Sequence, residues 1–277
     1  MKLIKSNYEI LEQKPGLEGI YEQIELAGRT CYKSKRPEGQ TAKDFVDRMI
    51  ASQHYAMLEH GTVYLCIIPT EYGMFVNTDE IKDIVDRYKN NPYSKVIEYP
   101  KQPGYAVTTN YRVLVENGWL DDLKYLCEPT EFHEKRVTVR FVTSNGIARE
   151  FTRHRVFSFA QESTRYCNYT NQAKFGNELT YIHNSDEINI EQKDVYKRIE
   201  RCYKNLIASG MKPQMARDIL PLALKTELIM TGFVSDWKHL FRLRTSFIAE
   251  TGKPHPDMSN LCDPLYKEFV KRGFIEK

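Results

Sequence analysis

The sequence predicts an α+β protein in which a mixed sheet is flanked by helices, within one domain spanning residues 1–277. Three patterns support this class. Apolar residues recur at helical spacing over residues 17–30, a β-rich apolar run covers residues 62–68, and residues 136–143 alternate with period two. The first pattern is typical of an amphipathic helix, and the third is typical of a half-buried strand.

Local signals predict the other elements in chain order. A first strand is expected over residues 3–12, and a second helix should begin at Thr41, which forms a variant capping box with Asp44. Further on we expect a short helix over 81–88, a strand at 105–107, a turn at Asn145-Gly146, and helices over 147–152, 190–209, 213–221 and 259–272. The helix over 190–209 should turn the following side chains inward: Val195, Ile199, Cys202, Leu206 and Ile207.

Composition limits the functional class. At 41% hydrophobic and 28% charged residues the chain is expected to be a soluble globular protein. No apolar run approaches the ~20 residues of a membrane span, and no signal-peptide core follows Met1, so a cytoplasmic location without membrane partners is expected. A net charge of +3 is too small for a nucleic-acid binder that depends on bulk electrostatics, but it permits small anionic ligands.

The cysteines and histidines give no metal motif. The six cysteines are scattered without a Cys-x-x-Cys pair, which argues against a zinc ribbon or a disulfide framework and is typical of reduced cytosolic thiols. His54 and His60 are six residues apart and do not share one helix face, so no metal site is expected there. Residues 69–135 contain no chemical motif, and we expect an inserted elaboration that packs on the outside or at a subunit contact.

Residues 150–166 concentrate the groups that bind anions. Arg153, His154 and Arg155 are followed, after seven residues, by Ser163 and then Arg165. Guanidinium groups offer rigid forks of donors that match phosphate oxygens and stay charged at every physiological pH. The triplet alone also fits a solvated surface patch or a charge cluster at a helix C-terminus. The spaced pattern as a whole favours a site for a phosphorylated ligand.

This pattern, Arg-His-Arg, seven residues, Ser, one residue and Arg-Tyr, resembles the signature of the flavin-dependent thymidylate synthases. Two further segments resemble other motifs of that family. They are Ala-Arg-x-x-Leu-Pro at 216–221, which contains Arg217, and residues 236–244, which contain His239 and Arg244 and which the resemblance implies to be a helix. The resemblance implies a flavin-dependent thymidylate synthase-like fold and the conversion of dUMP to dTMP. It further implies bound FAD, 5,10-methylenetetrahydrofolate as carbon donor, NADPH as reductant, and a homotetramer whose active sites are shared between subunits.

The same resemblance assigns roles to residues. For FAD it implies His54, Ala56, Arg153, His154, Arg155, Gln161 and His239. For dUMP it implies Glu150, Arg153, Gln161, Glu162, Ser163, Thr164, Arg165, Arg217 and Arg244.

The chain departs from the family pattern at several positions. Glu150 stands where the family usually has Gln, and its carboxylate would repel a phosphate unless it faces away, is paired with an arginine or makes a modified pyrimidine contact. Phe233 and Ser235 replace the family's Asn-x-Arg, which contacts flavin, and Ala56 replaces a frequent Thr. His255 corresponds to a further family histidine if residues 251–254 are an insertion.

Two residues are candidates for activating the uracil ring. Ser163 could be a nucleophile, but its own loop contains no histidine to accept the proton. Arg244 could instead stabilise the anion formed when the N3 proton leaves, and we favour this role. Two alternatives remain open. One is a related enzyme that methylates or hydroxymethylates another pyrimidine nucleotide. The other is a non-catalytic nucleotide- or RNA-binding module in which Phe159, Tyr166 and Tyr169 stack on bases.

Overall fold

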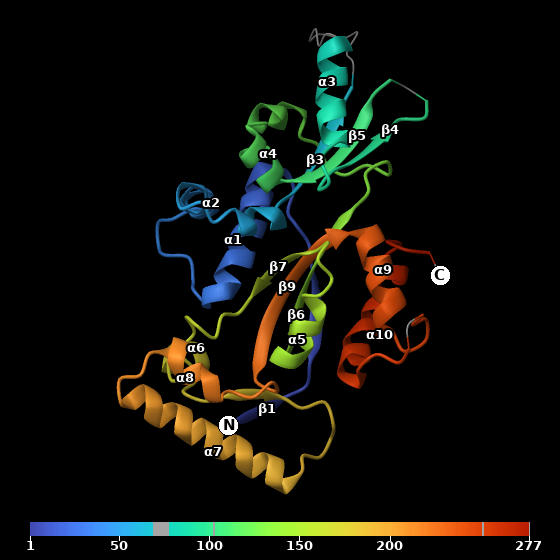
Figure 1. The fold of residues 1–277 in the computed structure, drawn as a ribbon. Helices are drawn as coiled ribbons and strands as arrows, with labels where there is room; N and C mark the ends of the chain where they lie inside the picture. Colours follow the sequence, from blue (N-terminus) through green and yellow to red (C-terminus); the bar gives the residue numbers. More distant parts are fainter. Residues whose placement is uncertain (69–77, 102, 251, 277) are drawn as a thin grey trace.

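The computed structural model describes residues 1–68, 78–101, 103–250 and 252–276, and it confirms the α+β class (Figure 1). The central sheet of the described chain has four antiparallel strands in the order β2 (Asn7–Leu11), β6 (Arg136–Ser144), β9 (Lys225–Phe233), β7 (Ser158–Gln161). A second antiparallel sheet has the order β3 (Thr62–Ile67), β5 (Tyr105–Asn110), β4 (Lys95–Glu98). The remaining pair, β1 (Lys2–Ile4) and β8 (Thr180–Ile182), is parallel. The strand predicted over residues 3–12 is therefore two strands, because β1 and β2 pair in different sheets.

Three helices cover one face of the central sheet: α5 (Asn145–Phe151), α9 (Val234–Arg244) and α10 (Pro256–Lys271). Their apolar side chains share a core with alternate residues of β6 and β9, and Trp237 of α9 is completely buried there. The indole nitrogen of Trp237 donates to the carbonyl of Val137 at 3.1 Å, so this large side chain is buried without an unpaired donor. The packing holds the C-terminal end of α9 near the end of α5.

The opposite face is covered by α1 (Gly16–Tyr32). Ala27 of α1 packs with Ala160 and Ile229, and Ile229 is a β9 residue that points away from its neighbours Leu228 and Met230. A second core joins α1 to the following elements: α2 (Ala42–Ala51), η1 (Tyr55–His60), α3 (Thr78–Lys89), α4 (Tyr111–Asn117), η2 (Leu120–Tyr125) and the sheet of β3, β5 and β4. The capping box of α2 is confirmed, since the Asp44 N–H donates to Thr41 Oγ1 at 3.2 Å and the Thr41 N–H donates to Asp44 Oδ2 at 2.8 Å.

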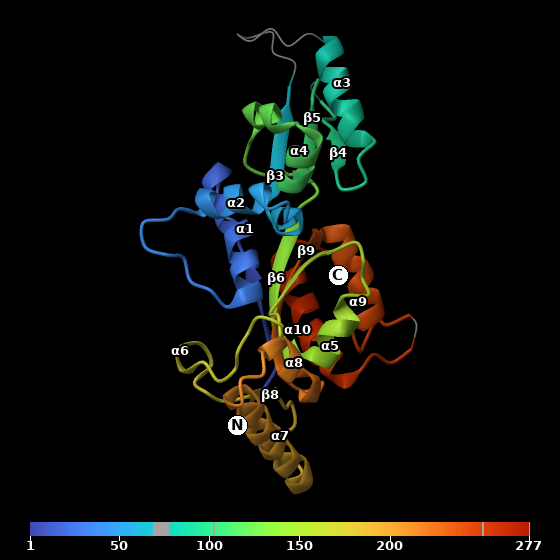
Figure 2. The same ribbon diagram turned by 60° about the vertical axis from the view of Figure 1, so that its left-hand side comes forward.

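The far end of the molecule contains α6 (Gln172–Phe175), α7 (Ile190–Ala208), α8 (Pro213–Ala216) and η3 (Arg217–Ile219), and Figures 1 and 2 both place α7 at the end opposite to α3. The predicted inward face of α7 was wrong for Val195 and Cys202, which are exposed. The buried residues are Tyr196, Glu200 and Tyr203. Tyr196 stacks on Tyr181, and the Glu200 carboxylate lies 2.7 Å from the ammonium group of Met1.

Two local predictions need correction. Asn145 and Gly146 do not form a separate turn but are the first two residues of α5, because the Ser144 hydroxyl caps this helix by accepting from the Ile147 N–H at 3.2 Å. The helix predicted over 213–221 is reduced to the short elements α8 and η3.

Part of the predicted insertion, residues 69–77, lies outside the described residues. Its remainder includes α3, β4, β5, α4 and η2, and β5 pairs with β3 along its whole length. Among the described residues, no helix combines the length and apolar character needed to cross a membrane.

Candidate active site

The Arg-His-Arg turn is held between two buried phenylalanines. Helix α5 ends at Phe151, which is fully buried, and Phe157 precedes β7. The Phe157 ring packs against Gly232 of β9, where a Cβ atom would lie 2.5 Å from the ring, so the close approach requires glycine. Because both ends of the turn are anchored, Arg153 and Arg155 are exposed while His154 between them is buried.

Arg244, the last residue of α9, contacts this turn. Its Nε donates to Nε2 of His154 at 3.1 Å, and its Nη1 lies 3.4 Å from Oε2 of Glu150. Burial, together with the charges of Arg244 and His239, lowers the pKa of His154 to about 4. His154 is therefore a neutral acceptor at physiological pH, and it fixes the direction of the guanidinium group.

An open hollow of about 670 Å³ lies beside this contact. Its lining includes four cationic side chains and one carboxylate: Arg149, Arg153, Arg244, Lys253 and Glu150. The Glu150 carboxylate is paired with Arg244, and this pairing is one of the arrangements that would keep it from repelling a phosphate. His255 also lines the hollow, where it caps α10 by accepting from the Asp257 N–H at 3.1 Å. The excess of positive charge suits an anionic ligand.

The other predicted arginines form a second group. Arg217 Nη1 lies 3.5 Å from Thr164 Oγ1, and Arg165 Nε lies 3.5 Å from Gln214 Oε1. Both arginines are exposed, and neither forms an ion pair within the described chain. Neither lines the hollow around Arg153. In a single chain, Arg153 and Arg244 converge, whereas Arg165 and Arg217 converge elsewhere.

Gln161 and Glu162, which lie between the Arg-His-Arg turn and the second arginine group in sequence, form hydrogen bonds with other side chains of the protein. Gln161 Nε2 lies 3.3 Å from both Asn145 Oδ1 and Thr226 Oγ1. Glu162 is buried, with one oxygen accepting from Lys225 Nζ at 2.7 Å and the other from the Tyr169 hydroxyl at 3.2 Å. Both Glu162 oxygens therefore already have partners on the protein.

Ser163 shapes the loop after β7. Its N–H donates to the Cys31 carbonyl at 2.9 Å, and its hydroxyl oxygen accepts from the Arg165 N–H at 3.2 Å. No histidine contacts this hydroxyl among the hydrogen bonds of the described residues.

Three predicted FAD residues lie on exposed surfaces. His54 and Ala56 are at the start of η1 and do not line the hollow. His239 is exposed on α9, close enough to lower the pKa of His154. Phe233, at the departure from the family pattern, is buried with the Arg136 guanidinium over its ring at 5.6 Å.

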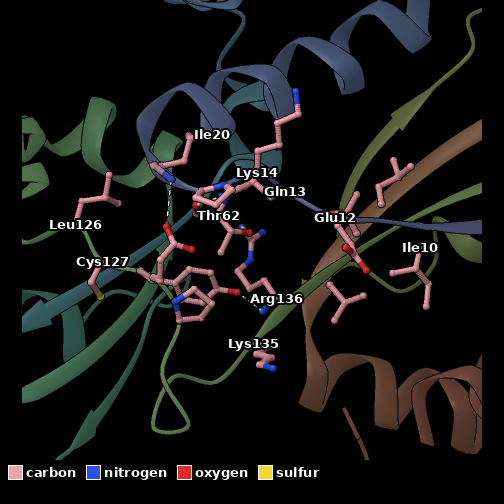
Figure 3. Close-up of a pocket in the computed structure, with 18 of the residues that line it drawn as sticks. Ile10, Glu12, Gln13, Lys14, Ile20, Thr62, Leu126, Cys127, Lys135 and Arg136 are labelled. Atoms are coloured by element: carbon pink, nitrogen blue, oxygen red, sulfur yellow. Dashed lines mark hydrogen bonds between the residues drawn. The ribbon is translucent and has the colours of Figure 1, made fainter. Parts of the chain in front are cut away.

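A separate pocket of about 380 Å³ lies between the start of α1 and strands β2, β3 and β6 (Figure 3). Gln13, Thr62 and Arg136 are among its lining residues, and Figure 3 also shows Cys127 beside Leu126. None of the predicted site residues lines this pocket. The hollow at Arg153 is therefore the candidate active site.

Sequence reasoning missed Arg149 and Lys253 as parts of the hollow. Arg149 precedes Arg153 by four residues, a spacing that places both on one side of a helical turn, and this signal could have found it. Lys253 had no comparable signal, because the path of the chain between α9 and α10 brings it to the site.

Comparison with known proteins defines the family. The sequence model of the family described as "Thymidylate synthase complementing protein" matches residues 97–272, well over half of the chain. The chain belongs to this family. The match includes α5, the Arg-His-Arg turn, Arg217 and α9, and it begins within the segment that we predicted to be an insertion.

Two relatives are about one third identical to this chain over the segments that align. A probable flavin-dependent thymidylate synthase of Paramecium bursaria Chlorella virus 1 is 33% identical over 152 residues, which are 50% of this chain and 69% of that protein. A flavin-dependent thymidylate synthase of Synechocystis sp. is 30% identical over 135 residues, 44% of this chain and 62% of that protein. Among solved structures, a UMP/dUMP methylase, PolB from Streptomyces cacaoi, superposes with a TM-score of 0.46 at 13% identity, covering 98% of this chain and 92% of that one.

Proposed function

We propose that this protein is a flavin-dependent thymidylate synthase that methylates dUMP to dTMP. The observation that carries the proposal is the contact of Arg244 with His154 beside Arg153 in a basic hollow, within a chain of the thymidylate synthase complementing family. We further propose 5,10-methylenetetrahydrofolate as the carbon donor, NADPH as the reductant and a cytoplasmic location. The family match favours this reading over an RNA-binding module.

The arginines fit FAD and dUMP as anionic ligands. Arg153, Arg155, Arg165 and Arg217 form no ion pair with the described residues, so their donors remain available to phosphate oxygens. FAD would be held by Arg153, His154 and Arg155 with Gln161 and His239, and it would supply hydride transfer to the pyrimidine.

The dUMP phosphate would be held by the loop from Ser163 to Arg165 together with Arg217. Each charge-assisted hydrogen bond contributes about 1.5–3 kcal/mol. The second arginine group does not line the hollow at Arg153 in one chain, and His54 and Ala56 lie apart from both. A homotetramer in which several subunits complete each site would bring these groups together.

Arg244 would activate the uracil ring. Its guanidinium is directed by neutral His154 and by Glu150, so a donor is fixed before substrate arrives. A preorganised donor that stabilises the anion left by loss of the N3 proton lowers the barrier by about 3–4 kcal/mol. Ser163 would bind substrate and not act as a nucleophile. No histidine contacts its hydroxyl in the described chain, and the hydroxyl oxygen already accepts a hydrogen bond from the Arg165 N–H.

The test is release of tritium from C5 of [5-³H]dUMP in the presence of FAD, 5,10-methylenetetrahydrofolate and NADPH. We expect release that depends on all three, with dTMP as the product by mass spectrometry. The protein incubated with FAD should be yellow and should be bleached by NADPH. A hydroxymethylated product would support the related pyrimidine enzyme, and protein that retains no FAD and releases no tritium would overturn the proposal.

A further inference from the structure

Two cysteines and a histidine from distant segments meet beside β3. Cys66 lies in β3, Cys127 follows η2, and His133 lies in the turn that precedes β6. Cys66 Sγ and Cys127 Sγ are 2.7 Å apart, and His133 Nε2 is 3.9 Å from Cys127 Sγ. All three potential ligand atoms lie within 4.8 Å of one another. Sequence spacing could not show this cluster, because Cys66 and Cys127 are separated by 61 residues.

Backbone contacts fix the three residues in place. The Cys127 N–H donates to the Tyr64 carbonyl at 3.0 Å, and Leu126 forms a bridge with Leu65. Cys127 therefore lies at the edge of β3, beside Cys66. His133 is buried, with Nδ1 facing the N–H and the hydroxyl of Thr130 at 3.1 and 2.9 Å. Because Nδ1 accepts from the Thr130 N–H, the neutral ring carries its proton on Nε2, which donates to the Leu65 carbonyl at 3.1 Å and lies 3.9 Å from Cys127 Sγ. The Tyr99 hydroxyl donates to Cys66 Sγ at 3.3 Å.

We propose that Cys66, Cys127 and His133 form a binding site for Zn²⁺. Two thiolates and an imidazole are a ligand set that this cation uses, with Zn–S distances of about 2.3 Å and Zn–N distances of about 2.0–2.1 Å. Tetrahedral coordination separates two such sulfurs by about 3.7 Å, so the thiols move apart by about 1 Å on binding. Both thiols lose their protons to solvent as the cation binds.

The imidazole can serve as a ligand through Nε2. Coordination moves the Nε2 proton to Nδ1, so the hydrogen bonds to the Leu65 carbonyl and from the Thr130 N–H are lost, and the Thr130 hydroxyl oxygen, 2.9 Å from Nδ1, accepts the proton instead. Cys127 lines the pocket of Figure 3, which gives a cation and one solvent molecule access to the site, and the solvent molecule completes the fourth position.

His133 distinguishes this site from a simple thiol pair. A disulfide between Cys66 and Cys127 would involve only the two sulfurs, and the buried imidazole of His133 would have no role in it. A cation instead joins three segments, and the turn containing His133 leads directly into β6, the strand that carries α5 and the Arg-His-Arg turn. The site is thus a cross-link of the fold, and it is independent of the proposed synthase activity.

Titration of the full-length reduced protein with Co²⁺ tests the proposal. Tetrahedral Co²⁺ with thiolate ligands has d–d bands to the red of flavin absorption, so bound FAD does not interfere. We expect about one Co²⁺ per chain, displaced by Zn²⁺. Cys66→Ser, Cys127→Ser and His133→Asn should each weaken Co²⁺ binding by about 100-fold or more, whereas Cys202→Ser, which alters an exposed cysteine on α7, should bind as wild type.

Wild-type protein provides a test that needs no variant to fold. A chelator should lower the unfolding midpoint of the Zn²⁺-loaded protein, and added Zn²⁺ should restore it. Absence of the d–d bands while all six thiols titrate as free would overturn the proposal. It would also be overturned by an intact mass lower by two hydrogens, with Cys66 and Cys127 recovered in one disulfide-linked peptide.

Discussion

Arg244 Nε donates a hydrogen bond to His154 Nε2 at 3.1 Å and so joins the end of α9 to the turn after α5, across 90 residues of sequence. The contact requires an unprotonated acceptor, and burial together with the charges of Arg244 and His239 lowers the pKa of His154 to about 4. The histidine therefore positions the guanidinium without competing for protons near neutral pH.

Replacing Arg244 by alanine should remove most turnover. If the guanidinium stabilises the uracil anion, Arg244→Ala should lower kcat by about 10²–10³-fold while FAD stays bound. Steady-state kinetics and the flavin spectrum measure the two effects. Arg242→Ala is the matched control, because Arg242 lies in the same helical turn but is exposed and paired with Glu250 at 2.7 Å. Equal losses in both variants would assign the effect to α9 as a whole.

Replacing Glu150 by glutamine should strengthen anion binding. Glu150 is the one carboxylate among the charged residues of the hollow, and it lies 3.4 Å from Arg244. Glu150→Gln keeps the shape and removes the negative charge, so Kd for dUMP should fall by about 2- to 5-fold at low salt and less at high salt. Calorimetry at two ionic strengths measures this. A higher Kd would show that the carboxylate itself contacts the nucleotide.

Replacing Ser163 by alanine should have a modest effect. The Ser163 hydroxyl accepts from the Arg165 N–H at 3.2 Å, so its loss loosens the loop by about 0.5–1.5 kcal/mol. Turnover should fall by about tenfold or less, mainly through a higher KM for dUMP. Loss of all measurable turnover in Ser163→Ala would instead support a nucleophilic serine.

Much of the fold was predictable where a local signal determines the structure. The Thr41–Asp44 box and the alternation of residues 136–143 correspond to the start of α2 and to β6. Strand β9 (Lys225–Phe233) was missed, because it is buried on both faces over most of its length and carries no alternation to detect. The burial of Glu200 could not be foreseen, since one of its two partners is the N-terminal ammonium group, in addition to Lys204 of the same helix.

The site was predictable as a set of motifs but not as a geometry. Sequence patterns identified Arg153 and Arg244, and the packing of α9 beside α5 brings them to one hollow. The same patterns could not indicate that Glu162 turns inward, because Lys225, its partner at 2.7 Å, lies on a strand that was not recognised. They also could not show that, within one chain, Arg217 lies outside the hollow that Arg153 lines.

Arg217 should affect nucleotide binding more than chemistry. It is exposed, lies 3.5 Å from Thr164 Oγ1 and has no carboxylate partner in the described chain. Loss of one charge-assisted contact of about 1.5–3 kcal/mol predicts that Arg217→Ala raises KM for dUMP by about 10- to 100-fold, with retention of FAD. Arg198→Ala, which removes an exposed arginine of α7, is the control. An unchanged KM for Arg217→Ala would remove this residue from the phosphate site.

Acid should destabilise the protein through two buried histidines. Burial lowers the pKa of His154 to about 4 and that of His60 to about 3, whereas both imidazoles titrate near about 6.5 in the unfolded chain. Between these values the unfolded chain binds protons that the folded chain does not, so the free energy of unfolding falls as pH falls from about 6.5 towards 4. His154→Gln retains an acceptor for Arg244 and should reduce this slope by up to about 1.4 kcal/mol per pH unit, the value for one proton. Urea unfolding at several pH values measures the slope. An unchanged slope in His154→Gln would show that His154 is not the group responsible.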